Sequence, residues 1–324
     1  MISNLISGAL LGLALVTGAN AQESYPTRPV TIVTPFAAGG GSDITTRMLA
    51  ESLRPILKQS VVVQNTAGAG GTVGTQFVAR AAPDGYTLLL HHVGMATAPA
   101  LYKDLQFDPL KSFEQIGLFT DQPMVIVSRK NFPANNIAEL IAYLKQNEGK
   151  VNFAAAGLGS ATHLCAMLFE QVTGTKVTMI QYKGASPALI DLQGERVDLL
   201  CDAPSFAGPH VASGTLKAFV VTGNKRLASM PTVPTAAESG IPHFDVSVWY
   251  GLYAPAGTPK PIIDTLSRAL QGAIQDPTVI AQMPKMETVL FSTSQATPVA
   301  HRERLASQIE LWRAMIKKVG IAPQ

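Results

Sequence analysis

A glycine-rich loop in residues 31–47 is the first candidate for binding chemistry. The segment reads TIVTPFAAGGGSDITTR, so a β-branched run ends in a proline and leads to three glycines, Gly39, Gly40 and Gly41. Ser42 follows where a helix N-cap belongs, and the first N–H groups of such a helix attract anions because they lack internal partners. Glycines let the backbone approach a ligand closely. The pattern indicates an anion site, with a tight turn that binds nothing as the alternative.

A second glycine loop and a histidine pair follow soon after. Residues 60–64 (SVVVQ) predict a strand, and NTAGAGGTVG then brings Gly71 and Thr72 before a second helix. A third predicted strand ends in His91 and His92. This alternation of strands and helices is typical of a parallel sheet whose strand ends share one crevice. Two glycine loops at one edge favour a shared ligand site, although a buried structural histidine pair is the alternative for the histidines.

A second α/β run begins near residue 124 and repeats the pattern of a strand, a glycine turn and a helix. The strand predicted at 151–156 leads into GLGSATH, a glycine turn with a hydroxyl cap before a helix. A later strand ends in YKGASP, and a strand at 197–201 ends in Asp202. Because these segments also follow strands, they predict a second wall for a ligand crevice.

The elements that must position these loops fall into two lobes. The two α/β runs and a late return strand place residues 24–123 and 248–324 in lobe one, and residues 124–247 in lobe two. The chain then crosses twice between the lobes, and the last two helices return to lobe one. The predicted fold class is α/β.

Composition limits the function classes. The chain has 324 residues, of which 47% are hydrophobic and 15% charged, with a net charge of +3 and no run of Lys or Arg. This mild charge does not indicate nucleic acid or a membrane surface as a partner. Residues 1–21 form an uncharged, apolar segment that ends in the small-residue pattern ANA, which predicts a cleaved export signal, with a retained anchor as the alternative. We therefore expect an exported mature chain that does not insert into the membrane.

Two cysteines, Cys165 and Cys201, are the only ones in the chain. An exported protein could oxidise them, but free cysteine is also among the most buried residue types. We predict that both are reduced and partly buried, Cys165 on a helix and Cys201 at a strand end, with Cα atoms more than about 7 Å apart. The six histidines show no Cys/His spacing motif, so we expect neither a metal site nor a cofactor.

Six segments, in this order along the whole mature chain, carry a family resemblance: PFAAGGGSDITTR, NTAGAGGTVG, APDGYTLLL, YKGASPAL, RVDLLCD and WYGLYAPAGTP. They resemble the tripartite tricarboxylate transporter substrate-binding proteins, the TctC or Bug family of periplasmic solute-binding proteins. The resemblance implies a two-lobed Venus-flytrap fold of type II with two crossing segments as its hinge. It also implies a periplasmic protein that delivers a small carboxylate to the membrane permease subunits of a tripartite transporter.

Carried over by position, the resemblance implies a ligand site between the lobes. Its residues in lobe one are Phe36, Gly39, Gly40, Gly41, Ser42, Gly71, Thr72 and His92. Its residues in lobe two are Ala155, Gly157, Ser160, Thr162, Gly184, Ser186 and Asp202. Two departures from the family pattern, the histidine pair and Cys201 in place of a common aromatic residue, point to an aromatic acid such as terephthalate as an alternative to a di- or tricarboxylate.

Two other function classes, an enzyme and a sensor subunit, are alternatives to transport. An exported enzyme could use Ser160 with His163, or the histidine pair, but GLGSA is not a GxSxG elbow and no acid follows in triad order. We therefore expect a protein without catalytic residues. A periplasmic subunit that senses a ligand for a receptor kinase has the same implied fold and is the alternative to transport. We expect a monomer in either case.

Overall fold

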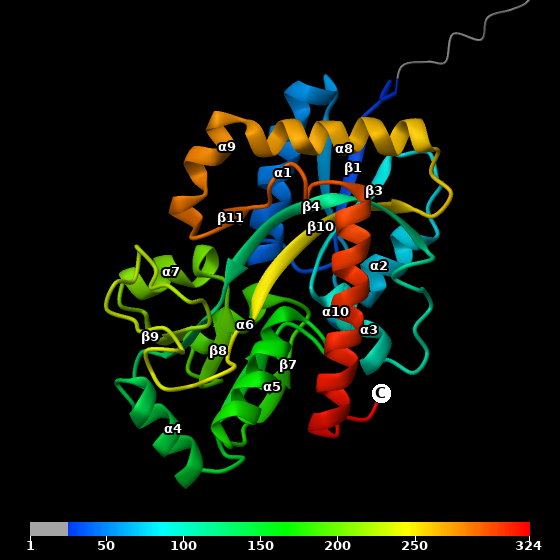
Figure 1. The fold of residues 1–324 in the computed structure, drawn as a ribbon. Coiled ribbons are helices and arrows are strands. Elements are labelled where there is room, and N and C mark those ends of the chain that lie inside the picture. The colour runs from blue at the N-terminus through cyan, green and yellow to red at the C-terminus, as the bar shows by residue number, and fades with distance from the viewer. Residues whose placement is uncertain (1–24) are drawn as a thin grey trace, which may run out of the picture.

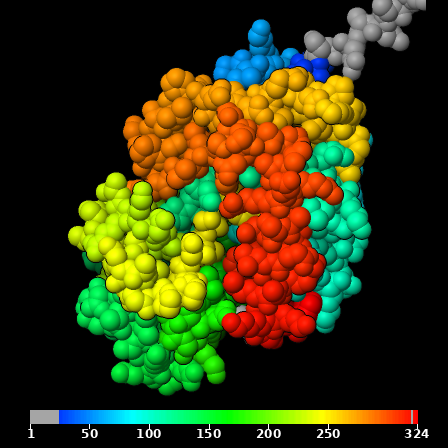
Figure 2. All heavy atoms as spheres, in the orientation of Figure 1, coloured from blue at the N-terminus to red at the C-terminus, as the bar shows by residue number. Residues whose placement is uncertain are grey.

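The computed structural model describes residues 25–324, which form two lobes, each built on one β-sheet (Figure 1). The predicted export signal, residues 1–21, lies outside the described residues. Within residues 25–324 we find no helix with both the length and the apolar character needed to cross a bilayer. Figure 2 shows a hollow on this face, between the yellow segment of the second lobe and the orange and red helices of the first.

The sheet of the first lobe has the strand order β11-β4-β10-β3-β1-β2. Its strands are β1 (Val30–Thr34), β2 (Val61–Asn65), β3 (Thr87–His92), β4 (Phe113–Pro123), β10 (Ser247–Pro255) and β11 (Val289–Leu290). Strands β1, β2 and β3 pair in parallel, as their alternation with helices predicts. The long strands β10 and β4 extend this sheet in antiparallel fashion, and both continue toward the second lobe.

Helices cover the first sheet. They are α1 (Gly41–Leu57), α2 (Thr72–Ala79), α3 (Gly94–Leu101), α8 (Lys260–Gln275), α9 (Pro277–Gln282) and α10 (Pro298–Val319), with short 3₁₀ turns η1 (Ala69–Gly71) and η2 (Pro284–Met286). Helix α8 packs on α1 and β4, and α10 packs on α3 and β4. The apolar stripe of α10, which includes Leu305, Trp312 and Ile316, is buried in the core.

The sheet of the second lobe has the strand order β7-β6-β8-β5-β9. Its strands are β5 (Val125–Arg129), β6 (Asn152–Ala155), β7 (Thr178–Gln181), β8 (Leu199–Asp202) and β9 (Leu216–Val221). Its helices are α4 (Ile137–Gln146), α5 (Ala161–Thr173), α6 (Ala185–Gln193) and α7 (Pro204–Ala212). Strands β7, β6 and β8 run in parallel, so the loops after them open on the same edge of the sheet.

The two segments that join the lobes are held together by one threonine. Thr222 Oγ1 accepts a hydrogen bond from Met124 N–H, between β4 and β5, at 2.8 Å. The same hydroxyl donates to the carbonyl of Val246, just before β10, at 2.6 Å. Because both connections pass through this contact, Thr222 fixes the two segments side by side.

The structure contradicts the prediction that Cys165 and Cys201 are reduced and far apart. They form a disulfide, and their Cα atoms lie 6.2 Å apart. Cys165 lies on α5 and Cys201 on β8, as predicted, and both side chains are fully buried. Helix α5 packs on β8, which brings the two side chains together, and sequence spacing alone does not reveal such a contact.

Candidate functional site

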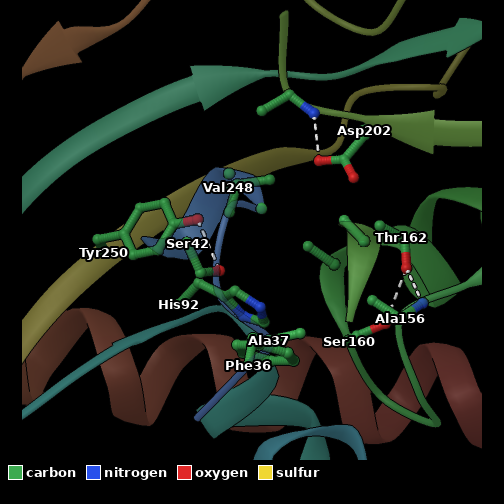
Figure 3. Close-up of a pocket in the computed structure, with 15 residues that line it drawn as sticks. Phe36, Ala37, Ser42, His92, Ala156, Ser160, Thr162, Asp202, Val248 and Tyr250 are labelled. Atoms are coloured by element: carbon green, nitrogen blue, oxygen red, sulfur yellow. Dashed lines mark hydrogen bonds between the residues drawn. The ribbon is translucent and has the colours of Figure 1, made fainter. Parts of the chain in front are cut away.

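Four helices begin at the wall of one small cavity where the lobes meet. Helix α1 begins at Gly41, α5 at Ala161, α6 at Ala185 and α7 at Pro204. Figure 3 shows the residues that line this cavity. The cavity has a volume of about 30 Å³. The described residues that line it are Phe36, Ala37, Gly40, Gly41, Ser42, His92, Ala156, Ser160, Ala161, Thr162, Ala185, Asp202, Ala203, Val248 and Tyr250. Each helix start directs unpaired N–H groups and partial positive charge toward this region.

The wall from the first lobe is built on the glycine loop before α1. Gly40, with extended backbone, is the N-cap of α1, so the expectation that Ser42 caps the helix is wrong. Ser42 instead lies in the first turn, where its Oγ is 3.1 Å from Tyr250 Oη on β10. Gly39 donates its N–H to Asp43 at 2.9 Å, and the next two residues, Gly40 and Gly41, line the cavity.

Of the two histidines at the end of β3, His92 lines the cavity and His91 is buried away from it. His92 stacks on Phe36, with ring centroids 4.6 Å apart. Its Nδ1 accepts the N–H of Gly94 at 2.9 Å, and burial lowers its pKa to about 3. The neutral ring therefore carries its proton on Nε2 and can donate a hydrogen bond. His91 is buried behind it, and burial lowers the pKa of His91 as well.

Two hydroxyl groups form the wall from the second lobe. Ser160 is the N-cap of α5, and its Oγ accepts from His163 N–H at 3.3 Å. Thr162 Oγ1 accepts from Ala156 N–H at 2.6 Å and lies 2.9 Å from Ser160 Oγ. The bond between these hydroxyls uses only one of their two protons, so the other is available to a ligand in the cavity.

The same loop argues against a serine nucleophile. The contact between Ser160 and His163 runs through the backbone N–H of His163. The ring Nδ1 of His163 accepts from Gly159 N–H at 3.2 Å instead, and burial lowers the pKa of His163 to about 4. The pair therefore lacks the bond from hydroxyl to ring nitrogen that a general base requires. Within the described residues, no group of three or more His, Cys, Asp or Glu is placed to hold a metal.

Asp202 is the one acidic side chain among the described residues of the cavity wall. It is 6% exposed, and its Oδ1 accepts the N–H of Ala203 at 2.7 Å. Its Oδ2 has no hydrogen-bond partner in the described part of the chain. Burial raises the pKa of Asp202 to about 7, although the Ala203 N–H acts in the opposite direction. The lining residues among 25–324 include neither Lys nor Arg.

Several residues predicted for the site lie around the cavity rather than in its described lining: Gly39, Gly71, Thr72, Ala155, Gly157, Gly184 and Ser186. A Cβ on Gly71 would lie 3.1 Å from both His91 Nε2 and Phe36 Cζ, so this glycine makes room for the rings. Thr72 donates its hydroxyl to Ala69 O at 2.9 Å, and Ala155 is buried in β6 beside the lining residue Ala156. These residues support the wall, and a direct ligand contact for them stays a prediction.

Two of these glycines lie where the lobes touch. A Cβ on Gly157 would lie 2.7 Å from the Cα of Gly70, and a Cβ on Gly184 would lie 2.7 Å from the Cβ of Ala37. Ser186 adds a hydrogen bond from its Oγ to Ala38 O at 2.8 Å. Both glycines therefore permit the lobes to approach closely around the cavity.

The sequence prediction missed other lining residues, above all Val248 and Tyr250 on β10. Their alternate positions in the strand sequence SVWYGLYA place them on one face, which was the available signal. The remaining lining residues are alanines, which contribute backbone and small surfaces. Ala37, Ala156, Ala161 and Ala185 lie within the segments that the sequence predicts as the walls of the site.

Comparisons with known proteins agree on one family. The model of the tripartite tricarboxylate transporter family receptor, TctC, matches residues 45–321. A protein from the TAR-I ttuE-ttuC' intergenic region of Agrobacterium vitis is 41% identical over 99% of this chain and 92% of its own length. The solved periplasmic binding protein BugD is 46% identical, with a TM-score of 0.90 over 93% of this chain and 100% of its own.

Two related structures were solved with carboxylates. MatC from Rhodopseudomonas palustris with bound malate is 34% identical, with a TM-score of 0.86 over 90% of this chain and 100% of its own. An R. palustris protein with adipate is 29% identical, with a TM-score of 0.87 over 93% of this chain and 100% of its own. The chain therefore belongs to the TctC or Bug family, whose members are periplasmic solute-binding proteins and not enzymes.

Proposed function

We propose that this protein captures a small carboxylate between its lobes and delivers it to the membrane subunits of a tripartite tricarboxylate-type transporter. The observation that carries the proposal is the convergence of four helix N-termini on one cavity. Backbone N–H groups fixed in this way bind anions without a basic side chain and lose little entropy on binding. The family model, which describes a transporter receptor, supports the delivery step.

The proposed contacts come from both lobes. The amides of Gly40 and Gly41, with the hydroxyl of Ser42, hold one carboxylate from the first lobe. Ser160 and Thr162 hold anionic oxygens from the second lobe through the free hydroxyl proton and the first amides of α5. His92 adds a neutral donor through Nε2–H. Charge-assisted bonds of this kind strengthen when closure of the lobes excludes water.

We infer an aliphatic acid rather than an aromatic one as the ligand. The histidine pair, which suggested an aromatic acid in the sequence, is engaged by Phe36 within the wall. Malate and adipate in the related structures are aliphatic dicarboxylates and support the same ligand class.

The proposed lobe division follows the two sheets. We place residues 24–123 and 248–324 in lobe one and residues 124–247 in lobe two, with the hinge at the two segments joined by Thr222. Residues 1–21 are proposed to direct export to the periplasm, where the mature protein would act as a monomer. The membrane permease subunits would then recognise the closed, loaded form.

A thermal-shift screen tests the binding proposal. The panel contains succinate, L-malate, adipate, citrate, L-aspartate and terephthalate, each added in excess. A ligand at 100 times its dissociation constant stabilises the fold by about 2.7 kcal/mol, and we expect such an increase with an aliphatic dicarboxylate. The absence of a shift with every carboxylate would contradict the proposal, and a shift with terephthalate alone would overturn the aliphatic assignment.

Transport and sensing require a second experiment. Deletion of the gene should abolish uptake of the radiolabelled acid that gives the largest thermal shift, and restored expression should recover it. Unchanged uptake, together with a lost transcriptional response to the same acid, would indicate the sensing role instead.

A further inference from the structure

Asp202 places an acidic group in the wall of a cavity that is proposed to bind an anion. Its side chain is 94% buried, Oδ1 accepts from Ala203 N–H, and Oδ2 is unpartnered among the described residues. Figure 3 shows the carboxyl group directed into the space between Ser42 and Tyr250 on one side and Thr162 on the other. The partial positive charge at the start of α7 favours the ionised carboxyl group, but burial outweighs it and raises the pKa of Asp202. An anionic ligand beside this buried group, which lacks a cation and a second donor, makes its charge less favourable still.

The groups around Asp202 cannot supply that cation. Its described surroundings contribute neutral side chains and backbone: Val125 pairs with Asp202 across the sheet, and the polar or aromatic side chains that share the cavity wall are Phe36, Ser42, His92, Ser160, Thr162 and Tyr250. Burial keeps His92 neutral by lowering its pKa and Tyr250 neutral by raising its pKa. Among these groups, Asp202 alone has a pKa near neutrality, which burial raises to about 7.

We propose that Asp202 takes up one proton from solvent when a fully ionised dicarboxylate enters the cavity, and that Oδ2–H then donates to a ligand carboxylate oxygen. This inference rests on the proposed function and deepens it, because it assigns the ligand as a dianion bound together with a proton. Oδ1 already accepts from Ala203, so the proton belongs on Oδ2, which faces the cavity. A ligand ammonium group at this place would act in the opposite way, because it would hold Asp202 ionised.

The sign of the pH dependence follows from this proton. Below the pKa of free Asp202 the group is already protonated, and affinity does not depend on its titration. Above that pKa each binding event must take up a proton, so the association constant falls by about tenfold per pH unit. The fall ends only above the pKa of Asp202 in the complex, which the bound anion raises further.

Isothermal titration calorimetry with succinate, L-malate and adipate tests the proposal. Titrations are made from about pH 6 to pH 9, in pairs of buffers with different ionisation enthalpies. At about pH 8 we expect uptake of about one proton per dicarboxylate and an affinity that falls by about tenfold for each further pH unit. Binding of these dianions without proton uptake would overturn the inference while leaving the proposed function intact.

Two variants separate Asp202 from the rest of the site. Asp202→Asn keeps an acceptor for Ala203 and places a neutral N–H donor where Oδ2–H would lie, so its affinity should be independent of pH and exceed that of the wild type at about pH 9. Ser160→Ala is the matched control, and it should weaken binding while the pH slope remains. Equal pH slopes in the wild type and Asp202→Asn would contradict the inference.

A further titration with L-aspartate distinguishes the ligand classes. Tighter binding of L-aspartate than of succinate at about pH 8, without proton uptake, would show that Asp202 acts as an ionised partner of an ammonium group and would overturn the assignment. If none of the carboxylates binds at any pH, the proposed function fails and this inference fails with it.

Discussion

Ser160 and Thr162 have one hydroxyl proton between them that is free to bind a ligand. Removal of either hydroxyl therefore tests whether the ligand binds here. Removal of the Ser160 hydroxyl by Ser160→Ala deprives the ligand of a donor and also removes the cap that accepts from His163 N–H. We expect binding of succinate or L-malate to weaken by roughly 1–3 kcal/mol, measured by calorimetry. Ser213→Ala, at the exposed end of α7, is the control and should leave affinity unchanged. Equal affinities for Ser160→Ala and the wild type would place the ligand elsewhere.

Gly40 allows a graded test of the glycine loop. A Cβ at Gly40 would lie 3.5 Å from both Ala185 Cβ and Ser186 Oγ, which is an ordinary contact, and its backbone is extended. Gly40→Ala should therefore fold normally and bind only slightly more weakly. Gly40→Val adds methyl groups in the space proposed for the ligand and should abolish the thermal shift with succinate, without lowering the melting temperature of the free protein. A normal shift in the valine variant would exclude this loop from the site.

The sequence predicts the polar residues at the helix starts around the cavity better than it predicts the other residues of the cavity wall. The residues before or within the first helical turns, such as Gly40, Ser160 and Thr162, were recognisable because caps and glycine turns have a local signature. Tyr250 was not, because its position depends on how β10 crosses from one lobe to the other. The hydroxyl of Ser42 was misassigned as a cap, since Gly40 already begins the helix and Tyr250 holds the hydroxyl.

The sequence predicts those elements whose pattern of residues lies within the element itself and the turn beside it. Strands β1 and β2 follow from β-branched runs that end in glycine turns, and β3 follows from a run of leucines. Helices α1 and α5 follow from the glycine turns before them. Strand β4 was missed because its sequence FEQIGLFTDQP lacks strict alternation, and it is buried between β10 and β11. The short elements α9 and β11 were missed because too few residues carry a periodic pattern.

The disulfide links the two elements of lobe two that carry Thr162 and Asp202. Because it closes a loop of 36 residues, Cys165→Ala/Cys201→Ala should lower the free energy of unfolding by roughly 3–4 kcal/mol. Chemical denaturation measures this loss, and reduction of the wild type should reproduce much of it. Intact mass after alkylation without a reductant checks the bond itself. Full labelling of both cysteines in the untreated protein would contradict the structure.

Gly251 on β10 faces the ring of His301 on α10. A Cβ at this position would overlap the Nε2 and Cε1 atoms of that ring, which is fully buried against Tyr253. We expect Gly251→Ala to destabilise the fold by about 1–3 kcal/mol, because the ring has little room to move. Thermal denaturation measures the effect. Gly257→Ala is the control for backbone strain alone. Gly257 has φ +80°, but a Cβ added there would have no heavy atom of the described chain within 4 Å.

At the scale of the whole molecule, the described structure is a closed arrangement held by a few polar contacts. Tyr102 shares its hydroxyl proton between Ala69 O of the first lobe at 2.7 Å and Leu158 O of the second at 2.8 Å. Thr97 Oγ1 donates across the same boundary to Gly159 O at 2.9 Å. Such contacts exist only when the lobes approach, so they bias the equilibrium toward the form that encloses a ligand.

Tyr102→Phe should therefore weaken ligand binding from outside the cavity. The loss of a neutral hydrogen bond costs about 0.5–1.5 kcal/mol, and because it falls only on the closed form, affinity for succinate should drop by about two- to tenfold. Small-angle scattering should show a larger radius of gyration for the free variant, with compaction restored by saturating succinate. Tyr143→Phe, on α4, is the matched control. A variant with wild-type affinity and an unchanged radius would show that this contact does not govern closure.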